Sequence, residues 1–156
     1  MAATLVLGLG NLLLGDDGAG LRLLAELERR RNWGPGIEFI DGGTQGLALL
    51  GYLSGRRALL LLDAVALGAP PGTVHLLRTA EIEALGAARA TTAHEGSARE
   101  LLAAARLLGE CPAEIVVVGI EPEQVRTGIG LSPVVEQAVH AAVERATTIL
   151  AQWLAT

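Results

Sequence analysis

The sequence contains no lysine and only one cysteine, and 3% of its 156 residues are aromatic. The missing lysine excludes a P-loop, which uses a lysine to bind phosphate. The net charge of −5 provides no polybasic surface for nucleic acid or anionic lipid. The single cysteine, Cys111, excludes an internal disulfide and any zinc site built from cysteines. Because aromatic residues are so few, Leu, Val, Ala and Ile have to fill the core.

Long hydrophobic runs are also missing. No apolar run approaches the roughly 20 residues that a transmembrane helix needs, and no basic stretch precedes the first apolar segment as it would in a signal peptide. We therefore expect a soluble protein of a reducing compartment, the cytoplasm, with no membrane insertion. With 51% hydrophobic residues, we expect residues 1–156 to form a single domain and to act as a monomer.

Short apolar runs alternate along the chain with stretches in which apolar residues recur at helical spacing. The apolar runs predict strands at 4–9, 37–40, 58–62, 73–77 and 115–120. The helical spacing predicts helices from about 18–20 to 31, over 45–53, as a turn at 79–85, from 97 to 108 and from 132 onward. The buried stripe of the last helix is predicted to be Val135, Val139, Ala142, Val143, Ala146, Ile149 and Leu150.

This alternation predicts the fold class. Strands that alternate with helices imply right-handed crossovers and a mostly parallel sheet. We expect an α/β, three-layer domain, with a twisted sheet of about five strands and helices on both faces. The loop before 73–77 is short enough to predict an antiparallel hairpin with the preceding strand. The stretch 87–96 has no period and is expected to be a loop.

The stretch from Leu5 to Gly20 places two adjacent carboxylates beside a buried strand. The strand turns through Gly10 and Asn11, and Asp16 and Asp17 stand just before the first helix. A charge removed from water shifts its pKa or binds a cation unless another group pairs with it. The two aspartates are equally compatible with first-turn acids that complement the helix dipole. The pair alone therefore leaves a site and a helix start as alternatives.

Further polar residues follow the predicted strands. Asp41, Asp63 and Glu121 each come after a strand, and His94 precedes the helix at 97. Ligands of parallel sheets bind beyond the carboxyl ends of the strands, although Asp41 also suits an ordinary turn and His94 an ordinary loop. Two or three carboxylates and one histidine form an oxygen and nitrogen ligand set that suits zinc or nickel. The residues alone indicate a candidate metal site in an α/β domain.

Two other motifs are incomplete. The turn Gly8-Leu9-Gly10 begins like a dinucleotide-binding loop, but Leu13 stands where the third glycine belongs. Two carboxylates then follow where a pyrophosphate would bind. His94-Glu95 begins like a zinc-protease helix, but Ala98 occupies the position of the second histidine. A nucleotide-binding domain is therefore the least favoured of the functions considered.

Several short motifs follow one another along nearly the whole chain. They are GNLLLGDDGAG at 10–20, IDGGT at 40–44, LDA at 62–64, TAH at 92–94, GIEP at 119–122 and LSP at 131–133. In order and spacing, this set resembles the motifs of the hydrogenase maturation endopeptidases. The resemblance implies an endopeptidase that cleaves the C-terminal extension from the nickel-loaded precursor of a nickel-iron hydrogenase large subunit.

The resemblance also implies roles for single residues. The metal-contacting positions of the family map onto Asp17, Asp63 and His94, which are also the implied catalytic residues. Many members carry Glu at the first of these positions, and this chain has the shorter Asp17. The supporting or substrate-binding positions map onto Asn11, Asp16, Asp41 and Glu121, the last of which is Gln in many members.

The metal itself has two interpretations. The nickel is expected to be carried by the substrate precursor, whereas the alternative is a resident divalent metal. Three protein ligands would leave that metal one position for a water or an oxyanion. A function from a different class is a non-cleaving, nickel-sensing or chaperone-like module that docks the precursor. Metal binding would be common to the endopeptidase and the docking module, and only formation of a cleaved product would separate them.

Overall fold

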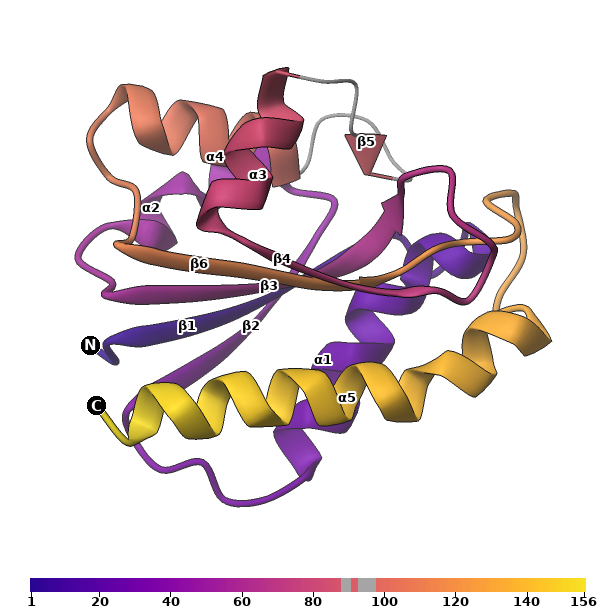
Figure 1. Cartoon of the computed structure of the whole chain (residues 1–156), viewed down its shortest axis with the longest axis horizontal. Coiled ribbons are helices and arrows are strands. Elements are labelled where there is room, and N and C mark those ends of the chain that lie inside the picture. The colour runs from indigo at the N-terminus through magenta and orange to yellow at the C-terminus, as the bar shows by residue number, and fades with distance from the viewer. Residues whose placement is uncertain (88–90, 93–97) are drawn as a thin grey trace.

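The computed structural model describes residues 1–87, 91–92 and 98–156. Its elements follow one another along the chain as strands and helices in alternation (Figure 1). They are β1 (Thr4–Leu9), the 3-10 helix η1 (Gly15–Gly18), α1 (Ala19–Arg29), β2 (Ile37–Gly43), the 3-10 helix η2 (Gly46–Leu49), α2 (Leu50–Leu53), β3 (Ala58–Ala66), β4 (Val74–Arg78), α3 (Thr79–Ala87), β5 (Thr91–Thr92), α4 (Ala98–Leu107), β6 (Glu114–Ile120) and α5 (Pro133–Leu154).

The sheet is mostly parallel, as predicted. Its strand order is β2-β1-β3-β6-β4, with the two-residue β5 joined to β3. β1, β2, β3 and β6 run parallel, whereas β4 is antiparallel to β6 and β5 is antiparallel to β3. The α/β class is confirmed. The carboxyl ends of β1, β3 and β6 therefore meet at one edge, where ligands of such sheets bind.

Helices cover both faces of the sheet, so the predicted three layers are present. Figure 1 shows α1 and α5 below the sheet and α2, α3 and α4 above it. On the α1 and α5 side, the core includes Val6, Leu60, Leu62, Val116, Val118, Leu23, Leu27, Val139, Val143 and Leu150. On the other side it includes Leu5, Leu7, Leu59, Leu61, Ile115, Val117, Leu49, Leu53, Leu101 and Ala105. Successive residues of one strand face opposite cores, which explains why β1 and β3 are continuous apolar runs.

The predicted hairpin between 58–62 and 73–77 is wrong. β4 is antiparallel, but it pairs with β6 and not with β3. β6 is rich in β-branched residues and is buried from Ile115 to Ile120, so it needs a strand on each side. β4 is only half-buried, which suits the edge position that the structure gives it.

Other elements differ from the prediction mainly at their ends. β3 continues through Asp63 to Ala66, because β6 and β5 supply backbone partners after β1 has ended. The helix predicted over 45–53 is divided into η2 and α2, and Gln45 precedes η2 without a side-chain cap bond. Ala87 belongs to α3 and 91–92 form β5, so these parts of the predicted 87–96 loop are regular structure. No helix in the described ranges combines the length and apolarity needed to cross a membrane.

Candidate active site

Asp17 lies in the turn that follows β1 and is completely buried. Its Oδ2 accepts a hydrogen bond from the backbone N–H of Asn11 at 3.0 Å. This short link depends on Gly10, whose φ of +144° suits glycine and whose added Cβ would collide with the carbonyl oxygen of Asp17. The structure therefore brings the predicted site residues Asn11 and Asp17 into contact, and the glycine between β1 and the turn permits it.

Asp63 lies in β3, where the start of α1 contacts that strand. Gly20, three positions after Asp17, packs directly on the backbone of β3. A Cβ on Gly20 would lie 2.8 Å from the Cα of Asp63 and closer still to the carbonyl oxygens of Leu9 and Leu62. Asp63 is fully buried, and its Oδ1 accepts from the N–H of Ala64 at 2.9 Å. Two buried carboxylates thus belong to elements in backbone contact at the carboxyl edge of the sheet.

The carboxylate of Asp16 binds the loop that follows β6, which is distant in the sequence. Its carboxylate accepts from the N–H groups of Glu123 and Gln124, both at 2.9 Å, and from the N–H of Ser132 at 2.7 Å. The hydroxyl of Ser132 donates to it at 2.8 Å. Burial opposes ionisation of this carboxyl group, but the hydrogen bonds from Gln124, Ser132 and Glu123 outweigh it and lower the pKa of Asp16. Asp16 therefore supports the loop that follows β6.

Glu121 forms a second buried cluster at the end of β6. Its Oε1 accepts from the N–H groups of Leu67 at 2.9 Å and Ala69 at 3.2 Å, and it lies 3.0 Å from Nε2 of His75. Only 5% of Glu121 is exposed. The side chain consequently holds the loop between β3 and β4 against β6. The resemblance implies a supporting or substrate-binding role for Glu121, and the structure shows that Glu121 connects these elements by hydrogen bonds. Its partner His75 lies in no motif that would identify it.

Asp41 shows the geometry of an ordinary turn. It is exposed at the end of β2, and its Oδ1 accepts from the N–H of Gly43 at 3.0 Å. This is the side-chain turn that an aspartate before glycines favours. His94 lies outside the described residues, and so do Glu95 and Ser97, at which the helix over 97–108 was predicted to begin. Within the described ranges, no group of three or more His, Cys, Asp or Glu side chains is arranged to hold a metal.

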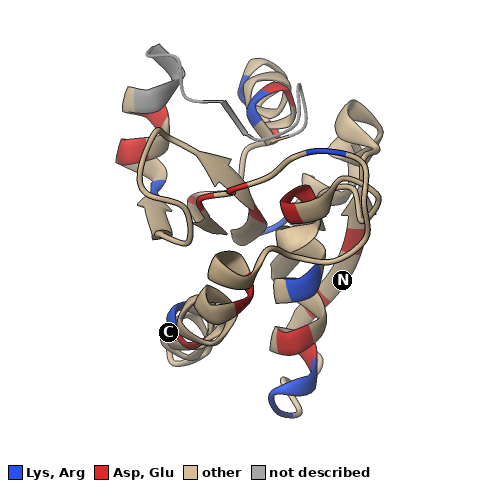
Figure 2. Ribbon diagram, turned by 90° about the vertical axis from the view of Figure 1, so that its right-hand side faces the viewer, with Lys and Arg blue, Asp and Glu red and all other residues tan. Residues whose placement is uncertain are grey.

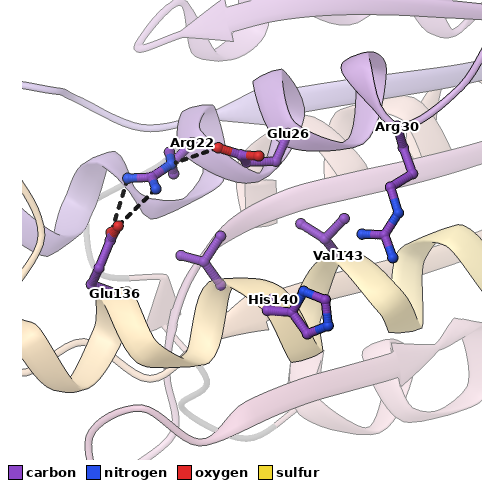
Figure 3. Close-up of a pocket in the computed structure, with 7 residues that line it drawn as sticks. Arg22, Glu26, Arg30, Glu136, His140 and Val143 are labelled. Atoms are coloured by element: carbon purple, nitrogen blue, oxygen red, sulfur yellow. Dashed lines mark hydrogen bonds and ion pairs between the residues drawn. The ribbon is translucent and has the colours of Figure 1, made fainter.

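A separate pocket of about 220 Å³ lies between α1 and α5 (Figure 3). Its charged groups bind one another across the two helices. Arg22 forms a bidentate pair with Glu136 at 2.7 and 2.9 Å and also contacts Glu26 at 3.2 Å. Arg30 pairs with Glu144. Because these ion pairs connect the helices that cover one face of the sheet, we interpret this pocket as a seam between helices and place the functional site at the carboxyl edge.

Comparison with known proteins identifies the family of this chain. Residues 21–149 match the sequence model of a family described as hydrogenase maturation protease. The chain is 38% identical over 147 residues to the hydrogenase 2 maturation protease of Escherichia coli strain K12, which covers 94% of this chain and 89% of that protein. It is 36% identical over 150 residues to the hydrogenase expression/formation protein HupD of Bradyrhizobium diazoefficiens, covering 96% of this chain and 78% of that protein.

Solved structures show the same fold. The hydrogenase maturating endopeptidase HybD from Escherichia coli superimposes with a TM-score of 0.83 at 35% identity, covering 97% of this chain and 93% of that one. A [NiFe] hydrogenase maturation protease HybD from Thermococcus kodakarensis gives a TM-score of 0.78 at 30% identity, covering 96% and 99%. The similarity therefore extends over nearly the whole chain and its arrangement of layers.

Proposed function

Because this chain belongs to the hydrogenase maturation protease family and is thus an endopeptidase, we propose that it processes the precursor of a nickel-iron hydrogenase large subunit. In this proposal the enzyme removes a C-terminal extension after nickel has entered the precursor. The nickel is then part of the substrate. Residues 1–156 act as one domain, and the protein works as a cytoplasmic monomer.

The placement of Asp17 and Asp63 supports this proposal most directly. Both carboxylates are fully buried, and the contact of Gly20 with Leu62 and Asp63 fixes their elements against each other. Peptide hydrolysis needs a water that is activated by a base and a group that stabilises the oxyanion. In water-poor surroundings a carboxylate attracts a cation more strongly than it does in solvent. A carboxylate such as Asp17 or Asp63 is suited to the first task, whereas the second needs a cation that the carboxylates hold, because an anion repels the oxyanion.

We propose that Asp17, Asp63 and His94 contact the nickel of the precursor and position the scissile bond next to it. Carboxylate oxygens and an imidazole nitrogen form a suitable ligand set for nickel. A resident divalent metal on the same three residues would supply a Lewis acid for the same bond. Because Asp17 and Asp63 are both buried, either arrangement requires that the precursor opens access to them when it binds.

Mass spectrometry of the precursor tests this function. A nickel-loaded large-subunit precursor is incubated with the protein, and a nickel-free precursor serves as the control. We expect loss of a C-terminal peptide from the loaded form only. Cleavage of both forms would favour a resident metal or an acid mechanism without metal. Binding without cleavage of either form would support the alternative of a nickel-sensing docking module and overturn the proposed endopeptidase activity on this substrate.

Single variants test the proposed residues. His94→Ala and Asp63→Asn are expected to abolish cleavage while the far-ultraviolet circular dichroism spectrum is retained. Glu28→Gln is the matched control, because Glu28 is an exposed carboxylate on α1. Full activity of either site variant would exclude that residue from the mechanism. Unchanged nickel-dependent binding of the precursor by Asp63→Asn would exclude Asp63 as a nickel contact.

A further inference from the structure

Four exposed apolar side chains belong to the two loops that border the candidate site. Leu12 and Leu13 belong to the loop before η1, and Val125 and Ile129 to the loop after β6. Their exposed fractions are 55%, 61%, 40% and 86%, respectively. We call these four residues the apolar rim. Large apolar side chains gathered in one exposed place mark an interaction site more often than isolated ones do.

The two loops of the apolar rim are bound to each other through their backbones. The N–H of Gly15 donates to the carbonyl of Gly128 at 2.8 Å, and the N–H of Gly128 donates to the carbonyl of Leu13 at 2.9 Å. Asp16 adds its hydrogen bonds to Glu123, Gln124 and Ser132. The rim is thus held in one shape before any partner binds, which reduces the entropy lost on binding.

The rim carries little charge. The segment 10–15 has no charged residue, and 124–131 has only Arg126, whose Nη2 donates to the side chain of Gln124 at 3.2 Å. Figure 2 views the molecule toward this edge, and most of the loop ribbon in front is neither acidic nor basic. An uncharged, apolar segment complements such a surface. A strongly charged segment would lose its hydration there without gaining a partner.

The rim is continuous with the candidate site. Asn11 donates its backbone N–H to Asp17, and its side-chain oxygen accepts from the N–H of Leu13 at 2.9 Å. The Cδ2 atom of Leu12 lies 3.1 Å from the position that a Cβ on Gly18 would take, and Gly18 directly follows Asp17. A polypeptide that reaches Asp17 therefore has the rim directly alongside.

We propose that the apolar rim binds an uncharged, apolar segment of the substrate polypeptide next to the scissile bond. This inference rests on the proposed function, since it assigns the rim to the same substrate. An endopeptidase has to hold the chain on at least one side of the bond that it cleaves, and a preformed apolar surface beside the carboxylates does so without touching the reacting atoms. The rim then determines substrate affinity and not the rate of the chemical step.

Cleavage kinetics test the rim with matched controls. Leu13→Asn and Ile129→Asn each remove one rim side chain. Leu108→Asn and Leu107→Asn are the controls, because these leucines are 63% and 90% exposed and stand at the end of α4, near the start of β6 at the opposite edge of the sheet. Initial rates are measured against the concentration of nickel-loaded precursor. We expect each rim variant to raise KM about tenfold, with kcat within about twofold of wild type. The controls should match wild type in both constants.

Three results would overturn the proposal. The first is an unchanged KM in both rim variants. The second is a fall in kcat alone, which would place the rim in the chemical step. The third is a wild-type dimer on size-exclusion chromatography that both rim variants convert to monomer without a change in KM, since a second copy would then occupy the rim. If wild-type protein binds the precursor without cleaving it, the proposed function fails. The rim is then tested by dissociation constants for the precursor, which should rise in the two rim variants and stay at the wild-type value in the two controls.

Discussion

Gly20→Ala tests whether the contact between α1 and β3 sets the geometry of the site. The new Cβ would lie 2.8 Å from the Cα of Asp63 and closer to two carbonyl oxygens. All three neighbours are backbone atoms, so no side-chain rotation can relieve the overlap, and α1 has to move away from β3. Overpacking a core costs about 1–3 kcal/mol, and backbone neighbours place this case at the upper end, about 3 kcal/mol.

Alanine also has a favourable effect that has to be subtracted. Replacing glycine within a helix by alanine gains about 1 kcal/mol from helix propensity. The net loss is then about 2 kcal/mol, which corresponds to a fall in Tm of about 4–8 °C for a chain of this size. Gly51→Ala is the matched control, because Gly51 also lies in a helix, α2, and a Cβ there would meet nothing within 4 Å. Its Tm should rise by up to about 4 °C.

Differential scanning calorimetry and cleavage assays give separate answers for this variant. The assay is run well below the Tm of Gly20→Ala, where the protein is folded. Because the displaced helix carries Asp17 away from Asp63, cleavage should fall by more than tenfold, in line with the sensitivity of catalysis to displacements of about 1 Å. A Gly20→Ala protein with the Tm and activity of Gly51→Ala would refute the inference that this contact positions the site.

Three further predictions concern the ties around the site. Asp16→Asn should lower the unfolding free energy by about 2 kcal/mol at pH 7. The pKa of Asp16 is lowered in the folded protein, so the stability that its carboxylate contributes to wild type is present above about pH 4 and is lost as pH falls through the folded pKa. The unfolding free energy of Asp16→Asn, measured with urea, should therefore fall less on acidification than that of wild type. Glu121→Gln should keep a wild-type Tm because an acceptor remains, whereas Glu121→Leu should lower the Tm by about 4–8 °C. Equal Tm values for the two variants would contradict a stabilising role for the hydrogen bonds of Glu121. Arg22→Ala should cost less than about 1 kcal/mol, since Arg22 and Glu136 are 39% and 47% exposed, and a larger loss in urea unfolding would argue against a surface pair.

Much of the fold follows from hydrophobic pattern. β1 has the predicted bounds Thr4–Leu9, and each residue of the predicted α5 stripe is buried. Such elements are predictable because their burial is periodic along the chain. The pairing of β4 was missed for a different reason. Adjacency in sequence favours a hairpin, but the insertion of β6 between β3 and β4 depends on the need of β6 for partners on both sides, which is a property of the assembled sheet.

Sequence pattern names the candidate site residues, but the contacts that each of them makes come from the structure. Sequence pattern placed Asp16 and Asp17 together, yet successive side chains in the turn face different surroundings. Asp17 binds the N–H of Asn11, and Asp16 binds a loop more than a hundred positions away. Ser132 occupies the N-cap position of α5, but its hydroxyl donates to Asp16 and makes no cap bond. Long-range partners of this kind carry no local signal.

The adjacent aspartates explain how a small domain combines rigidity with a reactive corner. A carboxylate that accepts several hydrogen bonds stays ionised at neutral pH and cannot easily act as a base. Asp16 takes this structural duty and fixes the loop after β6. Asp17 accepts a hydrogen bond from Asn11, and the contact of Gly20 with Leu62 and Asp63 holds the start of the following helix against β3. The hydrogen bonds of Asp16 also hold the loop that carries Val125 and Ile129, so one buried carboxylate orders both the candidate site and the surface proposed to bind the substrate.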